Sequence, residues 1–331
     1  MSEFHVQVVR LGPIVKHPDA DTLSITKVHD YPVILKTGEF SEGELAVYVP
    51  IDAIVPKDDP RWAFLGDHRR IRAKRLRGVF SMGLLTRADP AWELGADVRE
   101  ALGIVKYEPP EERAIHGQNQ GPQLGAEDEP APDFLPIYTD VEGLRRWPDV
   151  LVAGEEVILT EKIHGANGRF LWHEDRLWVG SHKRVKRPDS DTIWWRVAHQ
   201  LGLAERLRAH PGIALYGEVY GRVQDLHYGA GAGELRLALF DALDVRERRY
   251  LDADDFLALA AQLGLPTVPV LYRGPWTEAL RDHSRGLSTM PGTQHIREGF
   301  VVRPIRERFE PRIGRTILKL VGEDYLLRKG G

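Results

Sequence analysis

The stretch Thr160-Glu161-Lys162-Ile163-His164-Gly165-Ala166-Asn167 decides how this chain is interpreted. It follows the strand-like residues VIL and precedes GRFLW, so it lies between two predicted strands. A Lys-x-x-Gly match alone carries little weight, because a chain of this length contains about one by chance. Lys319-Leu-Val-Gly322 is indeed a second match. The residues that accompany the first match therefore determine what it means.

Polar residues follow this stretch in a defined order. They are Ser181-His-Lys183-Arg184 after a predicted strand, Glu218 in LYGEVYG, Phe240-Asp241 in LALFDAL, Glu298-Gly299 in REGFVVRP and Lys319 in RTILKLVGEDYL. Singly, each acid is more often part of a solvated face, and a Phe in an apolar run is usually core. Together, after the first match, they favour a functional over a structural interpretation. A lysine that acts as a nucleophile must be neutral when it attacks, although its amine normally titrates near 10.4, and burial or neighbouring cations in a pocket lower that value.

This order and spacing resemble the covalent nucleotidyltransferase superfamily of ATP-dependent ligases and mRNA-capping guanylyltransferases. TEKIHGAN resembles the first motif of RNA ligases of the phage RNA ligase 2 type, and the resemblance covers about residues 135–331. It implies that Lys162 attacks the α-phosphate of ATP and forms lysyl-AMP. AMP then passes to a 5′-phosphate end, giving an AppN end, and a 3′-OH displaces AMP. The charge on phosphate oxygens calls for Mg²⁺ or Mn²⁺ and for Lys or Arg side chains.

The resemblance also implies roles for individual residues. Lys162 is the expected catalytic nucleophile, and Glu218 and Glu298 are the expected metal ligands. The expected nucleotide-binding residues are Glu161, His164, Gly165, Asn167, Ser181, Lys183, Arg184, Lys186, Glu218, Phe240 and Lys319. Among them, Gly165 allows close backbone approach, Phe240 stacks on adenine, and Lys319 binds the α-phosphate.

Two of these assignments leave alternatives open. The fifth motif of the family is usually Lys-x-Lys, but Ile317 and Val321 occupy the positions two residues from Lys319. Lys186 or Arg315 is then a candidate for the second cation, or that contact is missing. His164 is either the variable residue between lysine and glycine or a residue whose imidazole orders the site, and the resemblance favours the second interpretation.

Residues 1–105 form a predicted β-rich domain, because short apolar runs alternate there with Gly, Pro and Asp clusters. The segment HPDADTLS, His17–Ser24, resembles the signature of tRNA-binding OB folds, and RLRGVFSMGLL, Arg75–Leu85, resembles the closing strands of that module. A basic run can neutralise phosphates, and the nearby rings of Trp62 and Phe64 can stack on bases, which favours nucleic-acid binding over a merely solvated strand face. The candidate nucleic-acid-binding residues are Arg69, Arg70, Arg72, Lys74, Arg75 and Arg77.

The rest of the chain divides into a linker and a second domain. Residues 106–132 are rich in Pro, Gly, Gln and acids and are a predicted linker. Residues 133–331 combine predicted strands (EEVILTEKI, GRFLWHE, RLWVGS, IALYGEVYG, ELRLALFDAL, REGFVVRP) with predicted helices at 191–210, 252–265 and 276–287. The glycine run GAGAG, Gly229–Gly233, misses the dinucleotide-binding spacing and is interpreted as a flexible turn. We therefore expect the α+β class, with an amino-terminal OB-fold β-barrel followed by an adenylyltransferase domain of antiparallel sheets and flanking helices.

An OB module in front of a ligase core resembles the Deinococcus-type RNA ligase group. That resemblance implies an ATP-dependent RNA ligase that seals nicks in duplex nucleic acid whose 3′-OH strand is RNA. A related DNA ligase or guanylyltransferase is one alternative, which preferential labelling by GTP or equal sealing of all-DNA nicks would indicate. A non-catalytic RNA-binding protein is another, and it predicts RNA affinity without any lysyl-AMP.

Composition limits the remaining possibilities. The 331 residues have a formal net charge of −4 and no cysteine, which excludes a globally basic coat, disulfides, thiolate metal sites and cysteine nucleophiles. The start MSEFHVQVVRLG lacks the features of a signal peptide, and no apolar run approaches the ~20 residues of a membrane span. We expect a soluble cytoplasmic protein with nucleic acid as partner and no membrane association. The oligomeric state does not follow from the sequence.

Overall fold

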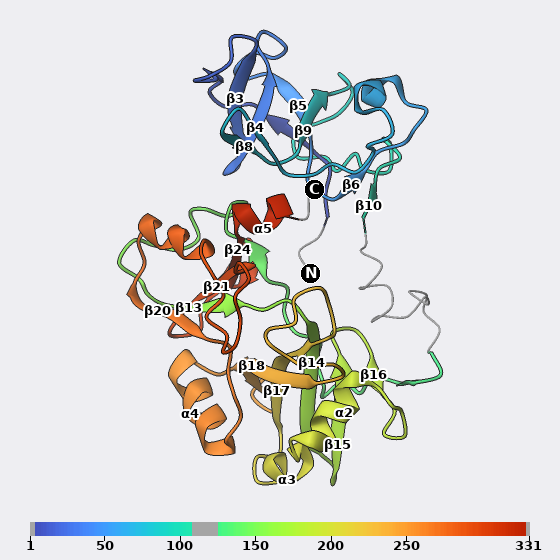
Figure 1. The fold of residues 1–331 in the computed structure, drawn as a ribbon, viewed down its shortest axis with the longest axis vertical. Helices are drawn as coiled ribbons and strands as arrows, with labels where there is room; N and C mark the ends of the chain where they lie inside the picture. The colour runs from blue at the N-terminus through green and yellow to red at the C-terminus, as the bar shows by residue number, and fades with distance from the viewer. Residues whose placement is uncertain (1–3, 108–124, 329–331) are drawn as a thin grey trace. The chain divides into compact units, whose positions relative to one another are not determined.

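The computed structural model describes residues 4–107 and 125–328 (Figure 1). Contacts between Cα atoms divide the described chain into two compact units. The first unit contains residues 4–107, 142–149 and 323–328, and the second contains 125–141 and 150–322. The domain boundaries expected from the sequence stay a prediction, since most of the expected linker, 106–132, lies outside the described residues. None of the helices described in either unit is long and apolar enough to cross a membrane.

The first unit is built from short antiparallel strands, which is the architecture expected of an OB fold. Its elements are β1 (Gln7–Arg10), β2 (Val15–Lys16), β3 (Leu23–Val28), β4 (Tyr31–Lys36), β5 (Leu45–Val49), β6 (Ala53–Ile54), η1 (Pro60–Leu65), β7 (Lys74–Leu76), β8 (Val79–Ser81), β9 (Leu84–Arg87), β10 (Val105–Lys106), β12 (Glu142–Gly143) and α5 (Glu323–Arg328). The strand orders are β1–β5–β9 and β2–β3–β4, with pairs β6–β10 and β7–β8.

Strand β5 is buried on both of its faces, which explains why its sequence LAVYV is almost continuously apolar. Val47 and Val49 pack into one core cluster, whereas Ala46 and Tyr48 pack into another. Successive side chains of a strand point to opposite faces, so each cluster takes alternate residues. The short apolar runs expected in the amino-terminal domain thus contain strands, among them β1, β3, β4, β5 and β9.

The second unit has a seven-stranded antiparallel sheet with helices on one face. The strand order is β11 (Asp128–Glu129), β16 (Val185–Lys186), β15 (Arg176–Ser181), β14 (Ala166–His173), β17 (Ile213–Gly221), β18 (Leu235–Asp244) and β19 (Arg249–Tyr250). The helices α2 (Ile193–Gln200), α3 (Leu203–Arg208) and α4 (Ala253–Leu263) cover this sheet through one apolar cluster that includes Phe170, Trp195, Leu207 and Phe256 (Figure 1).

A second antiparallel sheet in this unit carries the lysine-containing strand. Its order is β24 (Leu318–Val321), β21 (Gly299–Pro304), β13 (Glu156–Lys162) and β20 (Val270–Pro275). The remaining elements are the 3₁₀ helix η2 (Glu278–Ser284) and the hairpin β22 (Phe309–Glu310) and β23 (Gly314–Arg315). All six strands predicted in this part of the chain are present.

The predicted helices are correct in place but not in every detail. The helix expected over 191–210 is interrupted, because Gly202 adopts φ +59° between α2 and α3. The helix expected over 276–287 is the 3₁₀ helix η2 instead of an α-helix.

Candidate functional site

Lys162 lies at the end of β13, beside a buried carboxylate from the start of β21. Its Nζ is 2.8 Å from Oε1 of Glu298, and the two side chains are 26% and 8% exposed, respectively. Lys162 stands opposite Gly299 in the strand register, which brings Glu298 to the same end of the sheet. The predicted nucleophile is therefore partly accessible and held by an ion pair.

Glu218, from β17 of the other sheet, faces the same lysine. Its Oε1 accepts a hydrogen bond of 2.9 Å from the backbone N–H of Gly165. Burial raises the pKa of Glu218 from its ordinary 4.5 to about 7, while Lys162 opposes the shift and Glu298 adds to it. The hydrogen bond from Gly165 to Glu218 and the ion pair of Lys162 with Glu298 show that the two sheets bring Lys162, Glu218 and Glu298 to one site.

The turn between β13 and β14, residues 162–165, is here called the lysine turn. At Gly165 a Cβ atom would lie 2.4 Å from the carbonyl oxygen of Val219 and 3.0 Å from Cγ of Glu218. Only glycine allows the lysine turn to approach β17 this closely. The close approach at Gly165 is to the protein's own backbone, and the expected approach of this residue to a nucleotide stays a prediction.

Asn167 contributes an amide group next to the carboxylates. It lies opposite Glu218 in the pairing of β14 with β17, so the two side chains share a face. Two buried oxygen atoms, Oδ1 of Asn167 and Oε2 of Glu298, accept no hydrogen bond from any residue the structure describes. Such acceptors suit a hard cation or the donors of a bound substrate.

His164 contacts two carboxylates. Its Nε2 is 3.2 Å from Oδ1 of Asp225, and its Nδ1 is 3.7 Å from Oε2 of Glu298. Asp225, in the loop after β17, was not among the residues expected from the sequence. These contacts support the interpretation of His164 as an ordering residue over that of a variable position.

Glu161 is fully buried and points away from Lys162. Its Oε1 accepts a hydrogen bond of 2.5 Å from Oγ of Ser288, and its Oε2 accepts bonds of 2.7 and 2.6 Å from the N–H and Oγ1 of Thr289. Arg297 lies 3.6 Å from the same Oε2. Both carboxylate oxygens are therefore occupied by a loop of the protein, and nucleotide binding through Glu161 stays a prediction.

Lys319 shares a sheet face with Lys162. It pairs with Val301, which pairs with Thr160, and residues opposite each other on neighbouring strands point to the same side. Since Thr160 is two residues from Lys162, all of these side chains lie on one face. The register is compatible with the expected contact of Lys319 to a phosphate.

The two other candidates for the fifth-motif cation form ion pairs elsewhere in the second unit. Nζ of Lys186 is 2.6 Å from Oδ1 of Asp128. Arg315 is 2.6 Å from both Asp241 and Glu307. Each of these two cations thus has a carboxylate partner in the second unit, and which of Lys319, Lys186 and Arg315 supplies the fifth-motif cation stays a prediction.

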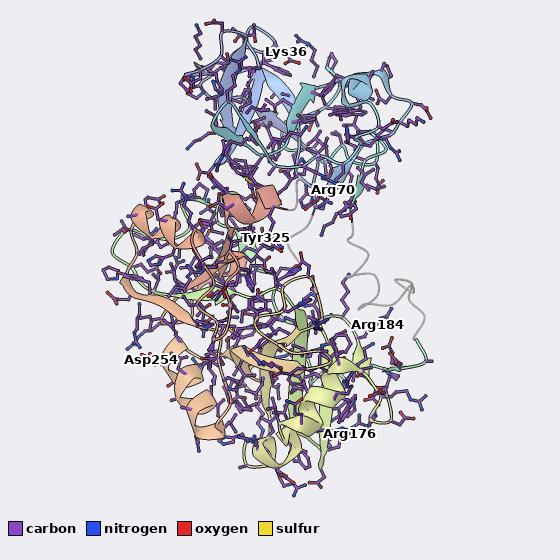
Figure 2. All side chains as sticks on the ribbon, viewed as in Figure 1. Lys36, Arg70, Arg176, Arg184, Asp254 and Tyr325 are labelled. Carbon is purple, nitrogen blue, oxygen red and sulfur yellow. The ribbon has the colours of Figure 1, made fainter. Side chains whose placement is uncertain are left out.

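Residues expected to contact the ribose and phosphate lie around the β15–β16 turn. The backbone N–H of Arg184 donates to Oγ of Ser181 at 3.1 Å, and the N–H of Ser181 donates to the carbonyl of Arg184 at 2.8 Å. Lys183 is exposed and directly precedes Arg184, which Figure 2 labels. Their predicted ligand contacts remain to be tested.

Phe240 is the extra residue of a β-bulge in β18. Tyr216 pairs with Asp241 and Gly217 pairs with Leu239, which leaves Phe240 unpaired between them. Its ring is partly buried and lies 4.9 Å from the ring of Tyr138 in an edge-on contact. Phe240 thus packs against the apolar cluster of Tyr138, and its stacking on adenine stays a prediction.

The basic run in the first unit is only partly exposed. Arg69, Lys74, Arg75 and Arg77 are exposed, whereas Arg70 and Arg72 are partly buried. These residues belong to or precede the hairpin β7–β8. The exposed members are the ones best able to neutralise phosphates.

Several of these basic side chains have partners within the first unit. Arg70 is 2.7 Å from Asp52 and stacks 3.6 Å above the ring of Tyr107. Arg77 donates to the carbonyl of Asp19 at 3.2 Å. Arg75 lies 3.6 Å from Glu323.

The aromatic residues beside the basic run differ from one another. Phe64 is 70% exposed, but Trp62 belongs to the core cluster of the first unit. The suggestion that Trp62 stacks on bases is therefore wrong, because η1 turns its indole inward. His17 is also buried. Its Nε2 lies 3.1 Å from the carbonyl oxygen of Leu76, and this contact links the HPDADTLS segment to β7.

A divalent cation fits the oxygen atoms of this site. Within residues 4–107 and 125–328, no group of three or more His, Asp or Glu is arranged to hold a metal ion. Magnesium needs fewer protein ligands, because it usually keeps several waters and binds one or two carboxylates plus substrate phosphates. Glu218 and Glu298 are two such carboxylates.

Comparisons with known proteins agree with this geometry. A family model described as RNA ligase matches residues 155–321, and one described as an OB-fold domain matches residues 5–88. No curated protein sequence matches the chain.

Solved structures match over nearly the entire chain. The RNA ligase of Naegleria gruberi with pyrophosphate has 24% identity and a TM-score of 0.83, over 99% of each chain. An alanine variant of that enzyme with ATP and Mn has the same identity, TM-score and coverage. Another variant, with AMP and Mn, has 24% identity and a TM-score of 0.82, over 98% of this chain and 99% of that one. These likenesses show an OB fold followed by a ligase-type nucleotidyltransferase fold.

Proposed function

The chain belongs to the RNA ligase family, and we propose that it is an ATP-dependent RNA ligase that works through a lysyl-AMP intermediate. The observation that carries this proposal is the meeting of Lys162, Glu218 and Glu298, from two sheets, at one partly accessible site. Structures of the Naegleria enzyme with ATP, AMP and Mn support the choice of nucleotide and metal.

The proposed reaction has three steps. Nζ of Lys162 forms a bond to the α-phosphorus of ATP, and pyrophosphate leaves. An oxygen of a 5′-phosphate end then attacks the same phosphorus, the phosphorus–nitrogen bond breaks, and an AppN end forms. Finally a 3′-OH attacks the 5′-phosphate, a phosphodiester forms, and AMP leaves.

Side chains of the site have separate roles in this proposal. Glu298 orients the Lys162 amine before it attacks ATP. The amine must have lost its proton when it attacks. Glu218 and Glu298 hold Mg²⁺ or Mn²⁺, which stabilises charge on phosphate oxygens when bound. Lys319 lies on the same face as Lys162 and contacts the α-phosphate, and Phe240 stacks on the base.

The proposed substrate is a nicked duplex whose 3′-OH strand is RNA, with nucleic acid bound through the basic run of the first unit. This choice rests on the Deinococcus-type order of OB module and ligase core. We propose that the enzyme acts in the cytoplasm. Sealing of RNA-containing nicks faster than all-DNA nicks is the expected result, and equal rates would point to a DNA ligase.

Covalent labelling tests the first step. Incubation with α-³²P-labelled ATP and Mg²⁺ or Mn²⁺ is expected to label the wild-type protein, and Lys162→Ala is expected to abolish the label. Lys36→Ala, at an exposed position of β4, is the control and is expected to label normally. Absence of label from the wild type, or its retention in Lys162→Ala, contradicts the proposal, and preferential labelling by GTP indicates a guanylyltransferase.

A further inference from the structure

The loop between β17 and β18, residues 222–234, binds the lysine turn at three points. The hydroxyl of Tyr228 accepts a hydrogen bond of 2.7 Å from the backbone N–H of His164. The side-chain amide of Gln224 donates to the carbonyl of Gly165. Asp225 lies 3.2 Å from Nε2 of His164. One short loop thus fixes the two residues that complete the lysine turn.

A second loop, residues 287–297, fixes the chain on the other side of Lys162. Its Ser288 and Thr289 supply the hydrogen bonds to Glu161, the residue that precedes Lys162. The chain is therefore held immediately before and shortly after the reactive lysine, by two segments distant in sequence.

The two loops also contact each other, and we call them together the loop clamp. The ring of Tyr228 meets the ring of His295 edge-on at 4.7 Å. Gly229 has φ +70°, and a Cβ there would lie 2.7 Å from the carbonyl oxygen of Gly292. The glycine run that was interpreted as a flexible turn thus provides a close backbone contact at its first residue.

We propose that Tyr228 is a positioning residue for adenylation, which acts through the loop clamp on the lysine turn. Its hydroxyl satisfies the buried backbone N–H of His164, so the peptide between Ile163 and His164 has one defined orientation. The Lys162 amine is thereby held in line with the α-phosphate, and small misplacements of reacting groups reduce rates strongly. The inference rests on the proposed function, but Tyr228 itself exchanges no atom in the reaction.

Tyr228→Phe tests the hydroxyl. The single-turnover rate of lysyl-AMP formation at saturating ATP is expected to fall at least about tenfold. The ATP concentration that gives half of the maximal rate should change less than about twofold. Tyr220→Phe is the matched control, because its ring contacts that of Tyr228 at 5.6 Å while its hydroxyl faces Arg236. Equal rates in the two variants, or a change only in the ATP concentration that gives half of the maximal rate, would overturn the proposal.

A pair of glycine variants tests the contact between the loops. Gly229 and Gly233 have φ +70° and +73°, but only Gly229 faces a neighbouring backbone, since a Cβ at Gly233 meets nothing within 4 Å. Alanine imposes the same backbone strain at both. Gly229→Ala is expected to slow adenylation as Tyr228→Phe does, and Gly233→Ala to leave it near the wild-type rate.

Amide hydrogen exchange gives a readout that needs no nucleotide. Gly229→Ala is expected to accelerate exchange in peptides covering 160–168 and 287–297, whereas Gly233→Ala affects only its own loop. The same exchange pattern in both variants overturns the loop clamp. A wild type that forms no adenylate overturns the proposed function instead, and the exchange data still decide the clamp.

Discussion

Glu218 is partly buried and has two neighbouring charges of opposite sign, Lys162 and Glu298. Its pKa is raised to about 7, chiefly by burial, so the folded protein binds this proton more tightly than the unfolded chain does. Ionisation of Glu218 therefore opposes folding. The penalty is absent below the unfolded value near 4.5, grows as the pH rises to about 7, and is constant above that.

Glu218→Gln is accordingly expected to stabilise the metal-free protein at high pH. Glutamine keeps an oxygen for the Gly165 N–H but carries no charge. We expect a gain of about 1–3 kcal/mol in the free energy of unfolding at pH 8, and little difference at pH 5. Urea unfolding in EDTA at both pH values measures this. Glu156→Gln, at an exposed position of β13, controls for the change of chemistry, and a variant no more stable than the wild type at pH 8 contradicts the prediction.

The residues of the site differ in how well the sequence predicts them. Lys162, Gly165, Glu218 and Glu298 were predicted because each stands in a recognisable local motif. Tyr228, Gln224 and Asp225 were not, since their partners lie some sixty residues earlier and no periodicity links them. Trp62 was misinterpreted for a related reason: a neighbouring run of arginines does not show which way one indole turns.

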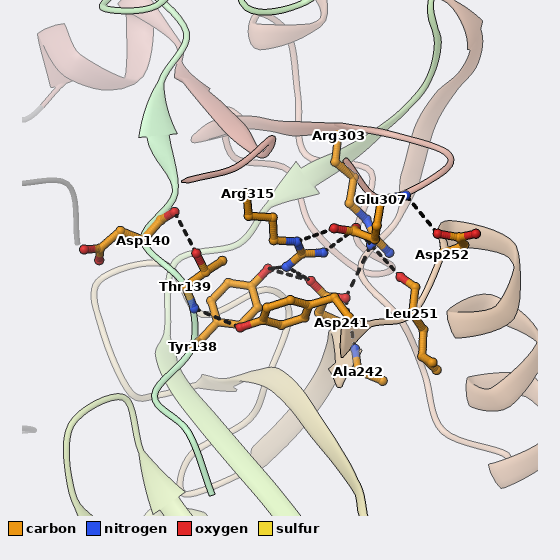
Figure 3. A network of polar contacts seen from close by, with 11 residues as sticks. Tyr138, Thr139, Asp140, Asp241, Ala242, Leu251, Asp252, Arg303, Glu307 and Arg315 are labelled. Atoms are coloured by element: carbon orange, nitrogen blue, oxygen red, sulfur yellow. Dashed lines mark hydrogen bonds and ion pairs between the residues drawn. The ribbon is translucent and has the colours of Figure 1, made fainter. Parts of the chain in front are cut away.

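A buried ion-pair network connects the two sheets of the second unit (Figure 3). Asp241 on β18 accepts hydrogen bonds from Tyr138 at 2.8 Å and from Arg315 at 2.6 Å. Arg303 on β21 lies 2.5 Å from Glu307, which also binds Arg315. Asp241 follows the bulge residue Phe240, so the network fixes the end of the bulge as well as the contact between sheets.

Arg315→Met is expected to destabilise the protein by about 3–5 kcal/mol, because it removes one of the two arginines that compensate the buried carboxylates Asp241 and Glu307 and leaves only Arg303 beside them. Equilibrium urea unfolding followed by circular dichroism measures the change. Arg312→Met is the matched control in the same hairpin region, since Arg312 pairs with Glu310 in an exposed position and its loss should leave the midpoint nearly unchanged. A similar small effect for Arg315→Met would show that the network does not stabilise the fold.

Secondary structure followed from the sequence where alternation was long enough. Strands such as β14, β17 and β18 carry eight to ten residues with clear patterns. Strands β16 and β24 were not predicted, because two and four residues are too few to show a period. The network of Arg315 could not be predicted from the sequence either, because the packing of two sheets, and not spacing along one strand, determines its carboxylate partners.

In the proposed function, the second unit carries out the nucleotide chemistry and the first unit binds nucleic acid. All residues expected to handle ATP lie in the second unit, and the basic run lies in the first. Formation of lysyl-AMP needs no nucleic acid, so this step should be separable from binding of the nick. Substitutions in the basic run can therefore be compared with an internal measure of intact chemistry.

The double substitution Arg69→Ala with Lys74→Ala is expected to weaken binding of a nicked RNA-containing duplex and to leave adenylation by ATP unchanged. Both side chains are exposed, whereas Arg70 is paired with Asp52 and should contribute less. The plot of log affinity against log salt has a negative slope, and loss of two phosphate contacts should make it shallower by about two. Fluorescence anisotropy across a series of KCl concentrations measures the slope.

The control for this pair is Lys27→Ala with Lys36→Ala, which removes the same charge from β3 and β4. Figure 2 shows Lys36 well apart from Arg70 in the first unit. If the control pair lowers affinity and salt slope as much as the basic-run pair, only the overall charge matters and the basic run is no binding site. If adenylation falls together with binding in the Arg69 and Lys74 variant, the two activities are not divided between the units.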